Sequence, residues 1–369
     1  RDFIINGVVA QLRMKPNSAS SAVPTVNVGR NFSSNNTDAN AIDVDFGNGI
    51  VASSAINITG NFTHTGNGVY QTTSASQAKG FVFRGSSSSP SQISYSGTNS
   101  DYTSYVVDAG SFASLTSNLT LGSSTGPASY FTVNGNLNFN DKSIIGNTVA
   151  RFITATGATL ATSNVDGLGG TAASGSLMSF SSTSTTSTNG TAQFIAGINY
   201  IFNGSTTTPF PTGTFGNPAS LTFNNADVTS NRTTTLTVTG AVNINGTSKF
   251  ALNSVAGNDL ALGGVMTIGA NASFDSNGEN QINNAGGSVV VNGTFITKDA
   301  QGFSGTNATI PTITNITLNT GSTIQYALDG AQAISSRTDY KNLLFTGNGT
   351  KSSNNSITPI AGTVTVSGA

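Results

Sequence analysis

Apolar and polar residues alternate in short runs along this chain, and the clearest runs lie between residues 236 and 274. Residues 236–250 align without a gap on residues 260–274, an offset of 24 residues. The matched apolar positions are Leu236 with Leu260, Val242 with Met266, Ile244 with Ile268 and Phe250 with Phe274. Apolar residues at every second position predict a strand with one buried face. A repeat at this distance is typical of a solenoid, whose stacked turns bury what one strand cannot.

Weaker runs of the same kind extend the pattern towards both ends of the chain. They occupy 42–46, 56–62 and 130–139, and later runs open at Leu221, Val289, Ile316 and Leu343. Residues 150–220 are less regular. Within them, 206–218 contains three prolines, which a central strand excludes, so we predict an insertion there that leaves the coil.

Asn-Gly pairs recur between the runs, at 134–135, 245–246, 292–293 and 348–349. Both residue types tolerate a positive φ, so we expect these pairs to turn corners at strand ends. Asn-Gly is also a strong hairpin signal, which makes an antiparallel meander or sandwich the alternative fold. The spacing between similar runs favours the coil. We predict an all-β fold, a right-handed parallel β-helix (solenoid) with about 22–27 residues per turn, continuous over residues 1–369.

Composition refines this picture of the fold and of its surface. Hydrophobic residues (36%) and 43 glycines suffice for a buried core, and recurrent strands with little charge argue against disorder. Charged residues make up only 8%, against about 25% in an ordinary soluble domain, so Ser, Thr, Asn and Gly must cover the surface. The net charge of −1 supplies no field that attracts nucleic acid. No apolar run approaches about 18 residues, so we expect no transmembrane segment.

The chain contains no cysteine, and its two ends lack the features of solenoid caps. Without cysteine the chain forms neither disulfides nor thiolate metal sites, so its stability must come from the repeat core. It begins with Arg1 and shows no signal peptide, and we expect a segment of a longer chain or a processed product. Neither end resembles the cap that a solenoid needs, so we expect contact with further segments or other copies of the same protein.

The C-terminal residues carry a family resemblance. Residues 321–335 (GSTIQYALDGAQAIS) lead through 340–351 (YKNLLFTGNGTK) to 360–366 (IAGTVTV). This succession resembles the repeat of large secreted surface proteins of Bacteroidota, many of them exported by the type IX system, and 56–62 and 130–139 resemble their looser rungs. The resemblance implies an extracellular adhesin-like or filament protein and carries over no catalytic residue. The family's folded C-terminal export domain is not found within residues 1–369, and we therefore expect a fragment or a product from which this signal has been removed.

Residues that could carry chemistry are few. His64 is the single histidine, which excludes histidine triads and multi-histidine metal sites, and we expect it on the surface, alternating away from Phe62. Asp43, Asp45 and Asn48 are the weak calcium candidate, because oxygen-rich clusters bind this ion. No further carboxylate follows at ligand spacing, and a solvent-facing pair before a turn is the alternative. We predict no catalytic residue, no cofactor and no other metal site.

Two classes of function remain. We favour a non-catalytic extracellular structural or adhesive protein, a stiff rod or filament segment on a bacterial surface, with further copies or segments, glycans or a substratum as partners. The alternative is a carbohydrate-active β-helix, lyase-like or hydrolase-like, or a glycan-binding module. Asp275 and Glu279 approach the paired carboxylates of glycoside hydrolysis. A groove lined by 206–218 and by Tyr95, Tyr102 and Tyr105 would fit this alternative, but the absence of Trp argues against it.

Overall fold

The structure is a computed structural model, and it describes most of the chain. The residues outside the description are 8–11, 14–24, 37–41, 47–54, 68, 72–79, 97–102, 123–127, 256, 258, 284–285, 354–356, 358–359 and 368–369. The described residues form strands, turns and bends, with no helix among them. Contacts divide the chain into an N-terminal unit (1–198 with 211–216) and a C-terminal unit (199–210 with 217–369).

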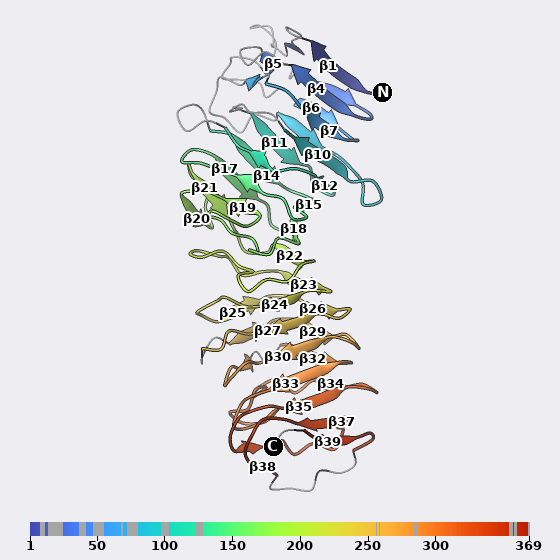
Figure 1. The fold of residues 1–369 in the computed structure, drawn as a ribbon, viewed down its shortest axis with the longest axis vertical. Coiled ribbons are helices and arrows are strands. Elements are labelled where there is room, and N and C mark those ends of the chain that lie inside the picture. Colours follow the sequence, from blue (N-terminus) through green and yellow to red (C-terminus); the bar gives the residue numbers. More distant parts are fainter. Residues whose placement is uncertain are drawn as a thin grey trace. The chain divides into compact units, whose positions relative to one another are not determined.

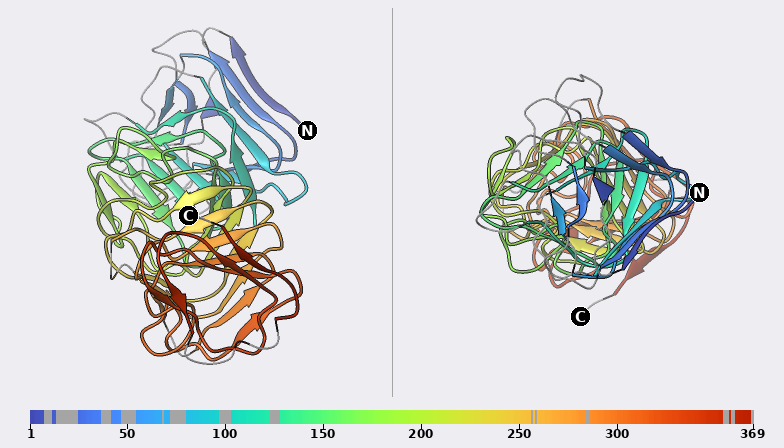
Figure 2. Two further views of the ribbon diagram at one scale, coloured as in Figure 1. Left: turned by 60° about the horizontal axis from the view of Figure 1, so that its bottom comes forward. Right: turned by 90° about the horizontal axis from the view of Figure 1, so that it is seen from above.

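The N-terminal unit contains two long sheets and two short ones (Figure 1). The β1–β18 sheet has the order β1 (Phe3–Gly7), β4 (Phe32–Asn36), β7 (Phe62–His64), β10 (Ser91–Tyr95), β12 (Phe112–Leu115), β15 (Asn136–Asn138) and β18 (Thr159–Thr162). The β3–β20 sheet has the order β3 (Thr25–Val28), β6 (Ala55–Ile58), β9 (Phe81–Phe83), β11 (Ser104–Val107), β14 (Tyr130–Val133), β17 (Arg151–Thr154), β21 (Thr191–Gln193) and β20 (Ser182–Ser184). The short sheets are β2 (Leu12–Arg13), β5 (Ile42–Asp45) and β8 (Val69–Gln71), and β13 (Leu119–Thr120), β16 (Ile144–Ile145) and β19 (Leu177–Met178). The turned views of Figure 2 show the dark blue to cyan strands of this unit lying side by side.

The C-terminal unit repeats this plan. The β22–β34 sheet has the order β22 (Asn199–Phe202), β23 (Ser220–Asn224), β26 (Val242–Asn245), β29 (Val265–Ile268), β32 (Ser288–Val291) and β34 (Ile316–Leu318). The β24–β39 sheet has the order β24 (Asp227–Thr229), β27 (Lys249–Ala251), β30 (Ser273–Asp275), β33 (Thr294–Thr297), β35 (Thr323–Tyr326), β37 (Asn342–Phe345) and β39 (Val364–Val366). The short sheets are β25 (Leu236–Val238), β28 (Leu260–Leu262) and β31 (Ile282–Asn283), and β36 (Gln332–Ala333) and β38 (Lys351–Ser352).

The strand register confirms the predicted parallel β-solenoid. The strand pairs of the described residues run parallel, which rejects the antiparallel meander. The predicted matches are direct neighbours across turns: Leu236 with Leu260, Val242 with Met266, Ile244 with Ile268 and Phe250 with Phe274. Turn length varies beyond the interval of 22–27 residues, since Phe3 pairs with Phe32 and Ile324 with Leu343. Like residues thus stack in register, but the number of residues per turn varies along the chain.

Columns of aromatic rings fill much of the interior. In the N-terminal unit the rings of Phe3, Phe32 and Phe62 follow one another at 5.7 Å, with interplanar angles of 5°. A second column joins Phe81, Tyr105, Phe131 and Phe152, with neighbouring centroids 5.9 to 6.0 Å apart. Offset ring pairs of this kind each contribute roughly 0.5–1.5 kcal/mol beyond the area they bury. These columns supply stability that a chain without disulfides needs.

The Asn-Gly pairs turn corners for two different physical reasons. Gly246 and Gly349 have φ values of 61° and 99°, as the sequence predicts for this pair. Gly135 and Gly293 are not among the positive-φ residues. At those two positions a Cβ atom would overlap carbonyl oxygens of the preceding turn, so glycine is required by close approach of two backbones.

The proline-rich segment 206–218 contains no named strand, and both of its phenylalanines contact rings of the core. In the C-terminal unit, buried Phe210 lies edge-on to Phe202, with ring centroids 5.8 Å apart. In the N-terminal unit, Phe215 contacts Phe194 at 6.1 Å. The segment thus contributes apolar side chains to the core of each unit that holds a part of it.

Candidate functional site

Asp275, one of the two carboxylates suggested for glycoside hydrolysis, is held in an ion-pair cluster of the C-terminal unit. Its side chain ends β30 and is buried, with 4% of the residue exposed. Its Oδ2 lies 3.1 Å from Nζ of Lys298 and 3.5 Å from Nζ of Lys249, one turn to either side. Its Oδ1 accepts the backbone N–H of Asn277 at 2.8 Å. Because the two lysines lie on the turns before and after it, Asp275 joins three neighbouring turns.

Glu279, the second of these carboxylates, is exposed and acts electrostatically on Asp299. Asp299 follows β33, is 3% exposed, and accepts the backbone N–H of Gln301 at 2.7 Å. Burial raises the pKa of Asp299, the hydrogen bond from Gln301 lowers it, and the negative charge of Glu279 raises it. A carboxyl group with a raised pKa near a second carboxyl group is an arrangement that acid catalysis uses. The burial of Asp299, however, leaves almost no surface for a substrate.

His64 lies in the interior of the N-terminal unit, so the prediction of a surface histidine is wrong. It ends β7, where Phe62 and His64 are buried and Thr63 between them is half-buried. Residues two apart in a strand share a face, and Phe62 therefore carries His64 inwards. The alternation around Phe62 therefore indicates an internal His64, because an apolar residue two positions away marks the buried face of the strand.

A compact polar cluster surrounds His64. Its Nδ1 lies 2.7 Å from Oγ of Ser34 and 2.9 Å from the hydroxyl of Tyr70, and these two oxygens are 2.6 Å apart. The ring of Tyr95, one turn further along the chain, stacks on the imidazole at 4.8 Å. Burial lowers the pKa of His64 to about 4, so the imidazole is neutral near pH 7. Ser34 and His64 resemble a nucleophile and its base in type, but at 1% and 0% exposure neither meets a substrate.

The predicted tyrosine-lined groove does not form from the tyrosines that the structure describes. Tyr95 and Tyr105 are 5% and 1% exposed and pack in the core, so the expectation that they line a groove is wrong. Tyr102 lies outside the described residues. Aromatic residues that alternate with polar ones in a strand indicate a buried face. The sequence alone does not distinguish such rings from exposed rings that stack on sugars.

The weak calcium candidate stays a prediction. Asp43 and Asp45 lie in β5, but the structure describes only their backbone. Asn48 lies outside the described residues. Among the described residues, no group of three or more His, Cys, Asp and Glu side chains could hold a metal ion.

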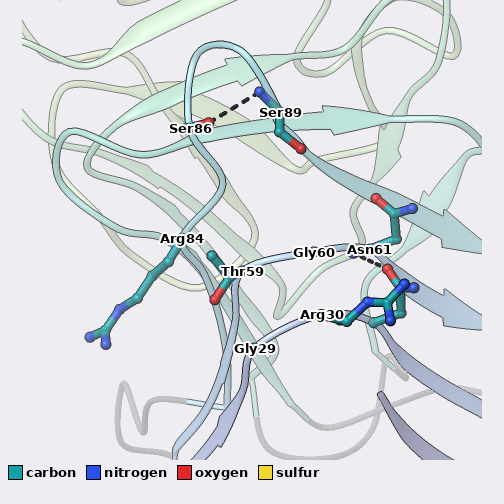
Figure 3. A pocket seen from close by; sticks show the side chains of 9 residues that line it. Gly29, Arg30, Thr59, Gly60, Asn61, Arg84, Ser86 and Ser89 are labelled. Atoms are coloured by element: carbon teal, nitrogen blue, oxygen red, sulfur yellow. Dashed lines mark hydrogen bonds between the residues drawn. The ribbon is translucent and has the colours of Figure 1, made fainter. Parts of the chain in front are cut away.

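A shallow pocket, the corner pocket, opens between three successive corners of the N-terminal unit. Its cavity volume is about 380 Å³ (Figure 3). The lining residues are Gly29, Arg30, Asn31, Thr59, Gly60, Asn61, Arg84, Ser86 and Ser89. Figure 3 shows the side chains of Arg30 and Arg84 directed away from each other at opposite sides of this pocket.

Polar side chains brace the corner pocket from turn to turn. The side-chain oxygen of Asn31 accepts the backbone N–H of Asn61 at 3.0 Å, and that of Asn61 accepts the N–H of Gln92 at 3.2 Å. Nε of Arg84 lies 2.9 Å from a carboxylate oxygen of Asp108. Since Asp2 also faces Arg30 at 3.9 Å, each arginine has its own counterion and the pocket has little net charge. A repeat of 22–27 residues does not predict this pocket, because Asn31 and Asn61 are 30 residues apart.

The fold and these sites define the chain as a parallel β-solenoid whose buried polar groups mainly join successive turns. No protein-family model, curated protein or solved structure matches the chain. Within the described residues, no helix has the length and apolar character needed to cross a membrane.

Proposed function

We propose that this chain is a non-catalytic structural segment of an extracellular adhesive protein on a bacterial surface. The observation that carries the proposal is the stacking of like residues in register, as in the match of 236–250 with 260–274. Such stacking gives each turn a covered core and paired backbone groups, so an extended element is stiff without disulfides or metals. The similarity of residues 321–366 to repeats of secreted Bacteroidota surface proteins supports the same role.

The polar sites support a structural role over a catalytic one. Asp275 is held by two lysines, and the Ser34, His64 and Tyr70 cluster is closed to solvent. Uncharged hydroxyl and amide groups replace the lysine and glutamate of an ordinary soluble surface. These groups keep the surface hydrated and neutral, which suits an element displayed outside the cell.

Labelling of intact source cells tests the location. Antibodies raised against the purified chain should label unpermeabilised cells, and brief external protease treatment should remove the signal. Labelling that needs permeabilised cells would contradict an extracellular role. A cytoplasmic protein of the same cells, which must stay unlabelled, controls for leakage.

A carbohydrate-active enzyme is the second candidate, and one observation favours it: the raised pKa of Asp299 beside Glu279. We expect no turnover on a panel of neutral and acidic polysaccharides. Release of reducing ends or of unsaturated products, abolished in both Asp299→Asn and Glu279→Gln, would replace the structural proposal. Asp227→Asn, at an exposed position of β24 in the same unit, is the matched control.

A further inference from the structure

The outer face of the β22–β34 sheet carries a straight row of uncharged side chains. In β22 and β23 burial alternates, so that residues between the core positions point outwards. The parallel register then places one outward residue of each strand next to that of the following strand. This row, which we call the neutral row, consists of Ile201, Thr222, Asn243, Thr267, Val290 and Thr317.

The neutral row differs from the outer face of the second long sheet in the same unit. None of the outward residues in the strands of the β22–β34 sheet is charged. The β24–β39 sheet, in contrast, presents Asp227 and Lys249 on neighbouring strands, followed by the Asp275 cluster. Charge is thus kept off one face of a unit that carries it on another.

The polar groups of the neutral row remain available to a ligand. Within the described part of the chain, the side chains of Thr222, Asn243 and Thr267 make no hydrogen bond to another protein group. They are half-buried, so their neighbours restrict them and less rotamer freedom is lost on binding. Their hydroxyl and amide groups recur at the strand spacing of about 4.8 Å.

A ladder of asparagines runs beside the neutral row and fixes its border. The amide of Asn224 donates to the side-chain oxygen of Asn203 at 3.0 Å, and the amide of Asn245 donates to that of Asn224 at 3.1 Å. Because each amide is held by the next, these side chains present a defined edge instead of mobile groups. The row therefore lies on an ordered surface.

We infer that the neutral row binds an extended neutral polysaccharide that lies across the strands. The inference rests on the proposed surface role and names the partner of that surface. Threonine and asparagine can hydrogen-bond the hydroxyl groups of sugar rings, while Ile201 and Val290 can contact their C–H faces. A repeating ligand on a repeating row gains affinity by making several weak contacts at once.

Other partners fit this surface poorly. An anionic polymer such as nucleic acid needs lysine or arginine, which the strands of this face do not carry. A protein partner usually relies on aromatic or arginine anchors at the centre of its interface, and the neutral row contains neither.

Sedimentation with insoluble polysaccharides tests the inference on the whole chain. The chain should sediment with cellulose or chitin and not with alginate beads. Binding should change little between about 0.05 and about 0.5 M salt, because no charges take part. The double variant Asn243→Lys with Thr267→Lys should lose about tenfold in affinity, because the ligand must then desolvate two cations.

Two further variants make the assignment decisive. Thr294→Lys with Thr323→Lys places the same charges on the outer face of the β24–β39 sheet and should bind as the parent does. Thr222→Val with Thr267→Val replaces two hydroxyl groups by methyl groups and keeps a β-branched side chain at both positions. This variant should also bind more weakly, because two hydrogen-bonding groups are lost. Absence of binding to every neutral polymer, or an equal loss in the control, would overturn the inference. If surface labelling persisted in that case, the proposed function would stand while the neutral row would lose its role.

Discussion

The two units use one fold to enclose different interiors. In the N-terminal unit the turns from Phe3 to Phe32 to Phe62 are long, and their core holds aromatic rings together with the buried His64. In the C-terminal unit the turn from Leu221 to Val242 is shorter, and the column of this sheet continues with aliphatic residues. The rings of Phe250, Phe274 and Phe295 follow one another on the other long sheet of this unit, 5.0 to 5.8 Å apart. Rings thus follow one another on both long sheets of the N-terminal unit, but mainly on the β24–β39 sheet in the C-terminal unit, so the same fold is filled in two ways.

The largest effect should come from the aromatic core. Phe62 contacts the rings of Phe32, Tyr70, Phe81 and Tyr105. Phe62→Ala should destabilise the N-terminal unit by about 3–5 kcal/mol, because it removes these contacts and leaves a cavity. Chemical denaturation followed by tyrosine fluorescence measures this change. Phe62→Leu is the control and should cost much less, and equal losses in both variants would show that ring contacts contribute little.

Acid should destabilise the N-terminal unit through His64. Its pKa is about 4 when folded and about 6.5 when unfolded, so the unfolded chain binds more protons between these values. The stability due to neutral His64 is complete above about pH 6.5 and is lost as pH falls towards 4, a change of about 3 kcal/mol. Denaturation midpoints measured across this range test the effect.

The control for this pH dependence is His64→Gln, which cannot titrate. The variant should show a flatter stability profile between pH 4 and pH 6.5 than the parent. Asp299, whose pKa is raised, acts with the opposite sign in both proteins and cancels in the comparison. Parallel profiles in the two proteins would contradict the assignment to His64.

A smaller loss is expected at the ion-pair cluster of the C-terminal unit. Lys298→Ala removes the nearer partner of buried Asp275 but leaves Lys249 in place. We expect about 1–2 kcal/mol, below the cost of an unpaired buried charge. The loss should vanish in the background of Asp275→Asn, as a double-mutant cycle would show. Full additivity would mean that the ion pair does not contribute.

The smallest effect should come from trimming the aliphatic column. Ile244→Val deletes one buried methylene group between Phe223 and Ile268, and we expect about 1 kcal/mol. The cost should exceed that of Ile201→Val, since Ile201 faces outwards on the same sheet. Reversed costs would contradict the assignment of these faces.

The sequence predicted the solenoid and its strongest register because similar residues recur at a constant distance, as Ile244 and Ile268 do. It did not predict the long N-terminal turns, where the repeat length drifts and alignment at a fixed offset fails. Nor did it predict the surroundings of His64 and Asp275. Alternation shows which residues share a face of a strand. It does not show which face is internal or which side chains contact each other across turns, because both depend on the packing of the folded chain.

The gap-free match of 236–250 with 260–274 also bears on how such a chain can lengthen. Duplication of the gene segment that encodes one complete turn would add a turn whose residues pair with similar residues on the turns before and after it. An insertion that shifts a strand by one residue turns its side chains onto the opposite face, and its apolar residues then leave the core. Addition of one whole turn is therefore the change in length that keeps like residues stacked on one another.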